Sequence, residues 1–433
     1  MKKTKMSSKF WVALTIFSLI GQVAWVVENM YFNVFIYKMF HASAADISAM
    51  VSASAISATL TTVFIGALSD KIGKRKLFIC GGYILWGISI WSFSLIRVDL
   101  IEKWIPLTAS AATIGVSLVI IMDCVMTFFG SSANDACFNA WVTDVTDDTN
   151  RGAAEGINSM MPLVAILVVF GGFMGFDLNQ ASSWTTIYQI IGCVVFLIGI
   201  LGIFLIKDVP VDTSQNQNYW KNIFYGFRPS VIKQNKMFYM VLSAFAIFCI
   251  SIQIFMPYLI LYYNVSLNME NYVLIMAPAV IVAAIVTVFY GRVYDRFNFK
   301  VAIIPAIGTL MIGYTLLYVF RSITWVFIGS LFMMSGYLMG MAIFGAMLRD
   351  YTPENRAGMF QGLRIVGQVL IPGIIGPWIG AKVLQNAKMI QNDDGTSSFI
   401  PNQNIFLAAF IVACVIWLVL AVIFHFIKQV EEN

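Results

Sequence analysis

The chain has 433 residues, of which 59% are hydrophobic and 11% are charged. Soluble domains carry about 25% charged residues, so this composition excludes a water-soluble globular protein and predicts a membrane protein. The formal net charge of +5 comes from Lys and Arg residues scattered through short polar breaks, which argues against a nucleic-acid-binding patch.

A helix needs about 20 apolar residues to cross the hydrocarbon layer of a bilayer. The first apolar run, residues 10–40, is too long for a secretory signal and predicts a retained first span. The pattern of apolar runs predicts twelve spans in all, at 10–36, 47–68, 77–96, 112–142, 155–176, 184–206, 237–262, 272–290, 301–320, 325–348, 358–380 and 404–427.

The longest polar break inside the chain, residues 207–236, divides the spans into two sets of six. We therefore expect an all-α membrane protein with an N-terminal six-helix bundle in residues 1–206, a cytoplasmic loop at 207–236 and a C-terminal six-helix bundle in residues 237–433. Twenty Lys and Arg residues fall on the side of the N-terminus and six on the other side. The positive-inside rule then predicts that both termini are cytoplasmic, in a multi-pass protein of the inner (plasma) membrane.

Two motifs recur at matching positions of the two halves. GALSDK (66–71) ends the second span and GRVYDR (291–296) ends the eighth, while Asp144…Arg151 follows the fourth span and Asp350…Arg356 follows the tenth. Such repeats indicate duplication of a six-helix unit, which is typical of transporters.

Residues 66–76 (GALSDKIGKRK) resemble the loop signature of the major facilitator superfamily. The resemblance implies two six-helix bundles with a substrate site between them. It also implies charged motifs whose aspartate braces one bundle against a helix of the other and latches the outward-open state. The latch residues it implies are Gly66, Asp70, Lys74, Arg75, Asp144, Arg151, Asp295, Arg296, Asp350 and Arg356. We expect Gly66 to let two helices approach closely. In the alternative interpretation these charges only anchor loops at the membrane surface.

Residues 134–141 (NDACFNAW) and 350–358 (DYTPENRAG) are similar to the glycoside–pentoside–hexuronide cation symporters. The resemblance implies that Asp135 contacts a sugar. Sodium-using members of that family carry carboxylates in the second span, whereas the second span here has hydroxyl groups and no acid. This departure favours a proton as the coupling cation.

Ionisable side chains inside a bilayer are costly and are candidates for function. Four lie well inside predicted spans, namely Glu28, Asp123, Asp135 and Arg364. Asp135 belongs to a stripe of polar residues spaced by four, which places them on one helix face that could line a pathway: Asp123, Thr127, Ser131, Asp135 and Asn139. The alternative for Asp135 is a carboxylate bonded to a neighbouring helix.

Glu28 lies on the first span near Trp25 and Asn29. An aromatic ring beside acids and amides suits a sugar, and burial favours the protonated form of a carboxyl group, so Glu28 is a candidate proton carrier. A simple interhelical hydrogen bond is the alternative. Asp123 lies about 30 Å above the inner end of its span and could reach the outer interface.

Arg364 shares a helix face with Gln361 and Gln368, where it could neutralise a carboxylate or extend to the membrane surface. Gln253 is a weaker candidate.

The sequence thus predicts proton-coupled uptake of a sugar or glycoside by a monomer in the lipid bilayer, with sodium as the less favoured cation. A facilitator or exporter of a non-sugar metabolite remains open, as does a sensor or membrane enzyme without transport. We expect no enzyme, cofactor or metal site, because catalytic constellations and metal-ligand spacings are missing from the sequence.

Overall fold

The computed structural model describes residues 6–104, 110–147, 150–208, 225–297, 299–352, 357–392 and 396–431. Within this part of the chain, twelve helical segments are long and apolar enough to cross a membrane, and they confirm the twelve predicted spans. The chain divides into two compact units, Met1–Tyr219 and Trp220–Asn433, called the N-terminal and C-terminal units below.

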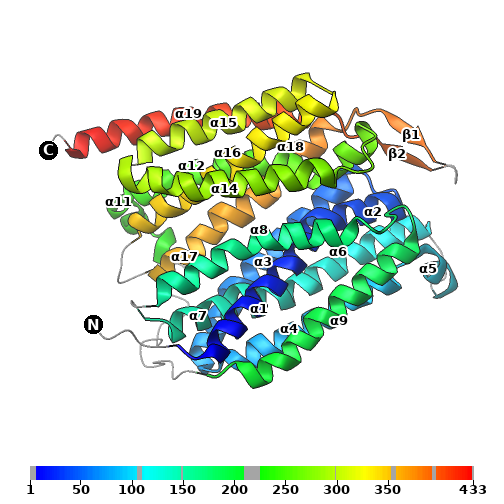
Figure 1. Ribbon diagram of the computed structural model, residues 1–433, viewed down its shortest axis with the longest axis horizontal. Helices are drawn as coiled ribbons and strands as arrows, with labels where there is room; N and C mark the ends of the chain where they lie inside the picture. Colours follow the sequence, from blue (N-terminus) through cyan, green and yellow to red (C-terminus); the bar gives the residue numbers. More distant parts are fainter. Residues whose placement is uncertain are drawn as a thin grey trace. The chain divides into compact units, whose positions relative to one another are not determined.

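The N-terminal unit contains the first six spans and one short helix that the sequence did not predict, α5 (Figure 1). Its elements are α1 (Ser8–Val26), η1 (Val27–Tyr31), α2 (Phe32–Phe40), α3 (Ala44–Ile72), α4 (Arg75–Ser92), η2 (Phe93–Leu95), α5 (Val98–Trp104), α6 (Ala111–Gly130), η3 (Ser131–Phe138), α7 (Asn139–Val145), α8 (Arg151–Phe173) and α9 (Ala181–Leu205).

The C-terminal unit contains the other six spans and a short antiparallel hairpin, in which Met389 pairs with Phe399. The hairpin adds two strands to the predicted all-α architecture. The elements are η5 (Tyr225–Phe227), α11 (Pro229–Gln234), α12 (Lys236–Phe255), η6 (Met256–Tyr258), α13 (Leu259–Leu261), η7 (Tyr262–Ser266), α14 (Val273–Phe297), α15 (Phe299–Val319), α16 (Ile323–Asp350), α17 (Ala357–Ile365), η9 (Val366–Leu370), α18 (Ile371–Val383), β1 (Met389–Gln391), β2 (Ser397–Phe399) and α19 (Asn404–Glu431).

The ends of α3 follow from local chemistry. Ser43 and Asp46 form a capping box, in which each side chain accepts from the backbone N–H of the other, so two unpaired donors of the first turn are satisfied. Gly73 ends the helix with a φ of 71°, in the left-handed region that glycine adopts without strain. The second span is therefore stopped just before the basic start of α4.

Glycines allow a close helix contact in the N-terminal unit, between α4 and α9. A Cβ atom on Gly87 would lie 2.4 Å from the backbone nitrogen of Phe196, and one on Gly192 would lie 2.6 Å from that of Trp91. Such contact is possible only where no side chain intervenes. Gly87 and Gly192 therefore allow the third span to pack closely against the sixth.

In the described part of the chain, four spans contain π-helical turns, which have one extra residue per turn. Two of these segments lie in the N-terminal unit, η1 and η3, and two lie in the C-terminal unit, η7 and η9. Glu28 belongs to η1, Asp135 to η3 and Gln368 to η9. Because π-helical turns are frequent at functional sites, their positions agree with the residues singled out from the sequence.

Candidate functional site

Glu28 is held between three helices of the N-terminal unit. Its Oε1 atom accepts hydrogen bonds from the hydroxyl groups of Ser54 on α3, at 2.6 Å, and Thr127 on α6, at 2.9 Å. The side chain is buried, and its Oε2 atom has no hydrogen-bond partner among the described residues. An acid with one bonded and one unbonded oxygen can still bind a proton or a ligand.

Asp135 lies in η3 and is only half-buried. The Ser131 hydroxyl donates to one carboxylate oxygen at 3.1 Å, and the Asn134 amide donates to the other at 3.2 Å. The indole N–H of Trp25 is buried without a hydrogen bond of normal geometry and lies within interaction range of this carboxylate. The arrangement combines a fixed acid with an aromatic ring and an available donor.

An amide network extends from Asp135 along the fourth span. Tyr83 donates to Asn134 at 2.9 Å, so the amide that holds Asp135 is itself oriented by the third span. Asn139 is exposed and accepts from Asn158 at 3.4 Å, and Asn158 in turn accepts from Ser18 at 2.7 Å. This network offers both donors and acceptors to a hydroxylated ligand.

The predicted polar stripe on the fourth span connects the two acids. Thr127 contacts Glu28, whereas Ser131 contacts Asp135 one turn further along. Asp123, at the start of the stripe, is covered by protein and only 1% exposed, and its depth in the membrane stays a prediction. Asn29, predicted beside Glu28, is exposed and donates to the Trp25 carbonyl at 2.8 Å.

The candidates of the C-terminal unit form a separate group. The Arg364 guanidinium donates to Gln368 at 3.2 Å, in keeping with their predicted common face. No described carboxylate of that unit forms an ion pair with Arg364, and the side chain of Gln361 lies outside the described residues. Gln253 is packed against Gly376, where a Cβ atom would lie 2.4 Å from the Cβ of Gln253.

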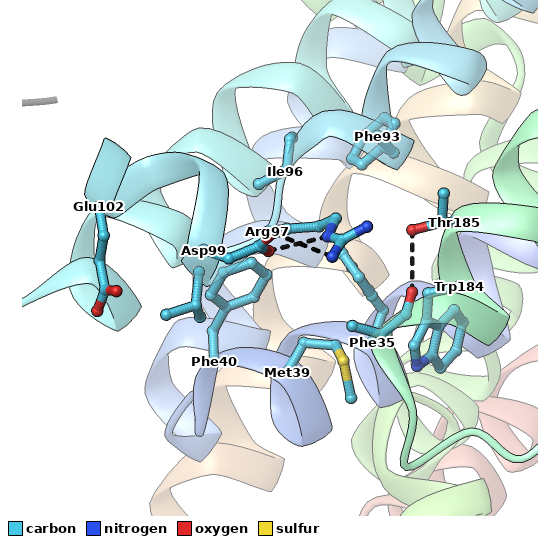
Figure 2. Close-up of a pocket in the computed structure, with 12 residues that line it drawn as sticks. Phe35, Met39, Phe40, Phe93, Ile96, Arg97, Asp99, Glu102, Trp184 and Thr185 are labelled. Carbon is cyan, nitrogen blue, oxygen red and sulfur yellow. Dashed lines mark hydrogen bonds and ion pairs between the residues drawn. The ribbon is translucent and has the colours of Figure 1, made fainter. Parts of the chain in front are cut away.

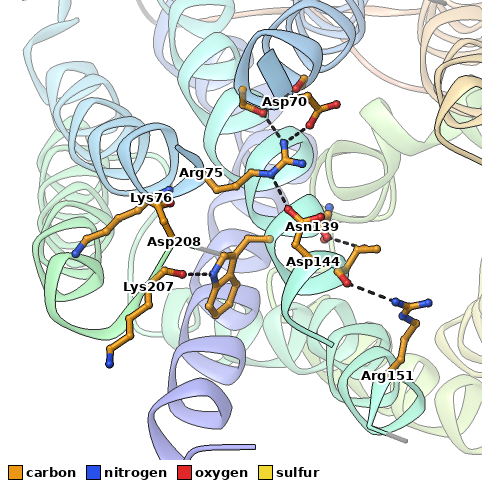
Figure 3. Close-up of polar contacts among 12 residues, drawn as sticks. Asp70, Arg75, Lys76, Asn139, Asp144, Arg151, Lys207 and Asp208 are labelled. Atoms are coloured by element: carbon orange, nitrogen blue, oxygen red, sulfur yellow. Dashed lines mark hydrogen bonds and ion pairs between the residues drawn. The ribbon is translucent and has the colours of Figure 1, made fainter. Parts of the chain in front are cut away.

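The first charged motif forms a cluster of ion pairs around the buried side chain of Arg75 (Figure 3). Arg75 is 5% exposed and forms ion pairs with Asp70 and, at 2.9 Å, with Asp144. It also donates to the Ser69 hydroxyl at 2.7 Å. The cluster therefore joins the ends of the second and fourth spans to the start of the third. The predicted contact of this motif with the C-terminal unit stays a prediction.

Arg151 and Lys74 stand apart from this cluster. Arg151 donates to the Thr146 carbonyl at 3.1 Å, where it satisfies the open C-terminal end of α7 (Figure 3). Lys74 is exposed at the N-cap of α4. An added Cβ on Gly66 would make an ordinary contact of 3.7 Å with Ala136 of the same unit, and the expected close approach of two helices at Gly66 stays a prediction.

The second copy of the motifs is only partly described. Asp350 accepts a hydrogen bond from Tyr294, and Arg296 lies over the ring of Phe297 at 5.2 Å. The side chain of Asp295 and the whole of Arg356 lie outside the described residues. The symmetry of the two latches therefore stays a prediction.

A cavity of about 460 Å³ lies where α2, η2, α5 and the start of α9 meet (Figure 2). Its walls include four aromatic side chains, and the ion pair between Arg97 and Asp99, at 2.9 Å, lies along it. None of the site residues predicted from the sequence lines this cavity. Among the described residues no group of three acids, histidines or cysteines is placed to hold a metal ion.

Sequence reasoning missed several partners of the acids. Ser54 is one of the hydroxyl residues of the second span, and the sequence does not predict its bond to Glu28. Nor does it predict the bond between Tyr83 and Asn134. Both are polar groups within otherwise apolar spans, which is the available signal for such residues. Their distance in sequence from Glu28 and Asn134 hides the pairing, since only the packing of the helices brings them together.

Comparisons with known proteins agree with this architecture. The sequence matches the Major Facilitator Superfamily over residues 11–377. The fold is similar to that of the nucleoside transporter NupG (TM-score 0.70, 14% identity, 97% of this chain and 99% of that chain). It is also similar to the xylose transporter XylE from E. coli (0.67, 15%, 95% and 98%) and to a bacterial homolog of the human lysosomal transporter Spinster (0.69, 15%, 97% and 97%). A search of curated proteins gave no significant match.

Proposed function

Because the chain belongs to the Major Facilitator Superfamily, we propose that this membrane transporter imports a sugar or glycoside together with a proton. In this proposal the protein lies in the inner (plasma) membrane of the cell, and both termini face the cytoplasm. Transport follows alternating access, in which two six-helix bundles move around a bound substrate.

The side chains around Asp135 are the observation from which we infer a sugar as the substrate. A half-buried carboxylate inside a membrane span is held by Ser131 and Asn134, beside the ring and the indole N–H of Trp25. Sugars have apolar C–H faces that pack on aromatic rings and hydroxyl groups that bond to carboxylates and amides. Asp135 and Trp25 therefore bind the substrate, with Asn139 and Asn29 as further polar contacts.

Two transporters of similar fold support a hydroxylated substrate. One is a nucleoside transporter and another is a D-xylose–proton symporter. A nucleoside and xylose both contain a five-carbon sugar. At 13–14% identity these likenesses concern the fold, so the substrate class here rests on the side chains around Asp135.

Glu28 supports coupling to a proton. Its hydrogen-bond partners are two neutral hydroxyl groups, and it lacks an ion-pair partner among the described residues. A charge buried without a counter-charge is costly, so binding of a proton relieves that cost. Substrate and proton then bind in one polar region and alter each other's affinity.

Uptake into proteoliposomes tests the proposal. Purified protein is reconstituted, a panel of labelled monosaccharides and glycosides is offered with an inward proton gradient, and a protonophore is added in a parallel sample. We expect accumulation of at least one sugar, with collapse of that accumulation by the protonophore. Labelled nucleosides form a second panel.

Three variants assign the roles. Asp135→Asn is expected to abolish sugar binding, whereas Glu28→Gln is expected to retain sugar exchange and lose proton-driven accumulation. Asp177→Asn, an exposed acid outside the spans, is the matched control and should transport normally. Entry of no sugar, or sugar entry that ignores the protonophore, contradicts the proposal.

A further inference from the structure

Asp123 is a buried acid whose surroundings leave its charge without compensation. Its side chain is 1% exposed, and its Oδ1 atom has no hydrogen-bond partner in the described part of the chain. No described basic side chain forms an ion pair with it. A carboxylate in such a place requires a proton or a cation nearby.

The position of Asp123 relates it directly to Glu28. It lies one helical turn before Thr127, whose hydroxyl donates to Glu28 at 2.9 Å, so both acids face the same space between α6 and the first span. The two carboxylates interact electrostatically. Glu28 also has one unpartnered oxygen, Oε2. Two buried acids thus present one unused oxygen each.

A third buried group lies at the same place and has no partner. The hydroxyl of Tyr188, on α9, is fully buried without a hydrogen bond among the described residues, and it interacts electrostatically with Asp123. The other titratable groups that face the two acids are Cys124 and Asp135. None of these neighbours brings a positive charge.

We propose that Glu28 and Asp123 form one proton-binding pair, in which the transported proton is shared between carboxylates of two different spans. The pair deepens the proposed function, because it rests on the coupling of transport to a proton. The proton enters from water by forming an O–H bond to a carboxylate oxygen, and it leaves when that bond breaks to water on the other side.

Electrostatic repulsion explains how such a pair controls release. Two neighbouring carboxylates in an apolar interior do not both ionise readily, so the pair holds one proton while it is closed to water. The doubly charged state becomes accessible only when water reaches the pair. Asp123 thereby makes proton release depend on the conformation of the carrier, and Tyr188 supplies a donor to the ionised pair.

Infrared titration of the purified protein without substrate tests the pair. The carbonyl stretch of protonated carboxyl groups is followed against pH in the unaltered protein and in Asp123→Asn and Glu28→Gln. Each variant loses one of two interacting charges, so its remaining acid should bind a proton at least tenfold more weakly, which moves the midpoint down by about one pH unit. Asp177→Asn should titrate as the unaltered protein does.

Further measurements keep the outcome decisive. Size-exclusion profiles identify folded variants, and Asp123→Glu, which keeps both charges, should retain a coupled titration. Replacing K⁺ by Na⁺ should leave the midpoint unchanged; a midpoint that moves with Na⁺ overturns the proton as the bound ion.

Two independent titrations, each unaffected by removal of the other acid, overturn the pair. A coupled titration in a protein that takes up no sugar would leave the pair standing and remove the substrate proposal. Proton-driven sugar uptake by a protein whose two acids titrate independently would support the substrate proposal and overturn the pair.

Discussion

The guanidinium group of Arg75 donates a hydrogen bond of 2.9 Å to the carboxylate of Asp144, which joins the start of the third span to the end of the fourth. Asp70, at the end of the second span, pairs with the same guanidinium. One cation therefore holds three spans of the N-terminal unit at a single point, although the motif was identified from the sequence as a latch between units.

Arg75→Ala is expected to lower the free energy of unfolding by about 2 kcal/mol, because two carboxylates lose their counter-charge. The value lies below that for a fully buried pair, since the Asp70 and Asp144 side chains are 40% and 26% exposed and water partly solvates them. Thermal unfolding in detergent measures the change. Arg97→Ala, which breaks the exposed pair with Asp99, is the control and should cost less than about 1 kcal/mol.

Trp25→Phe should weaken substrate binding while the aromatic ring remains. The change removes the unpartnered indole N–H, and the loss of one hydrogen bond of about 1 kcal/mol corresponds to a roughly fivefold rise in KM. Uptake kinetics with a sugar that the unaltered protein accumulates in proteoliposomes provide the measurement. Trp104→Phe, at an exposed position on α5, should leave KM unchanged, and an equal effect in both variants would remove Trp25 from the site.

Gly73→Ala should destabilise the protein by about 1 kcal/mol, because an alanine in the left-handed region brings its Cβ too close to the backbone. Gly81→Ala is the matched control on the next helix, where an added Cβ meets nothing within 4 Å and the helical backbone accepts alanine. Thermal unfolding of both variants compares them. If Gly81→Ala costs as much as Gly73→Ala, backbone conformation is not the cause.

The predicted orientation is tested by chemical labelling of intact cells. Asp177 follows the fifth span on the predicted outer side, and Asp208 follows the sixth span on the predicted cytoplasmic side. A membrane-impermeant maleimide should label Asp177→Cys in intact cells and Asp208→Cys only after permeabilisation. The unaltered protein corrects for its own cysteines, and the reverse labelling pattern would place both termini outside.

Hydropathy was sufficient to find the spans, because a bilayer demands long apolar helices and tolerates few charges within them. Glu28 and Asp135 stood out for the same reason. Each lies in a polar setting, although nothing in the sequence indicates that Ser54 bonds to Glu28. Which side chains form hydrogen bonds across two helices depends on the rotation of each helix about its axis. That rotation cannot be derived from a single sequence.

Other details depend on backbone geometry that leaves little trace in the sequence. The β1–β2 hairpin lies in a segment of polar and apolar residues between the last two spans, where hydropathy alone indicated only a break. Asp123 was placed by its height along an ideal helix, which says nothing of the side chains that cover it. Gly87 and Gly192 form close backbone contacts between α4 and α9 that residue type alone does not reveal.

The π-helical turns at η1 and η3 have a consequence for the comparison of sequences. Each such turn equals one residue inserted into a regular helix, and one residue corresponds to a rotation of about 100°. A relative whose first or fourth span is uninterrupted would align with this chain only across a one-residue gap inside the membrane. Ungapped alignment would match Glu28 or Asp135 to residues that point in another direction.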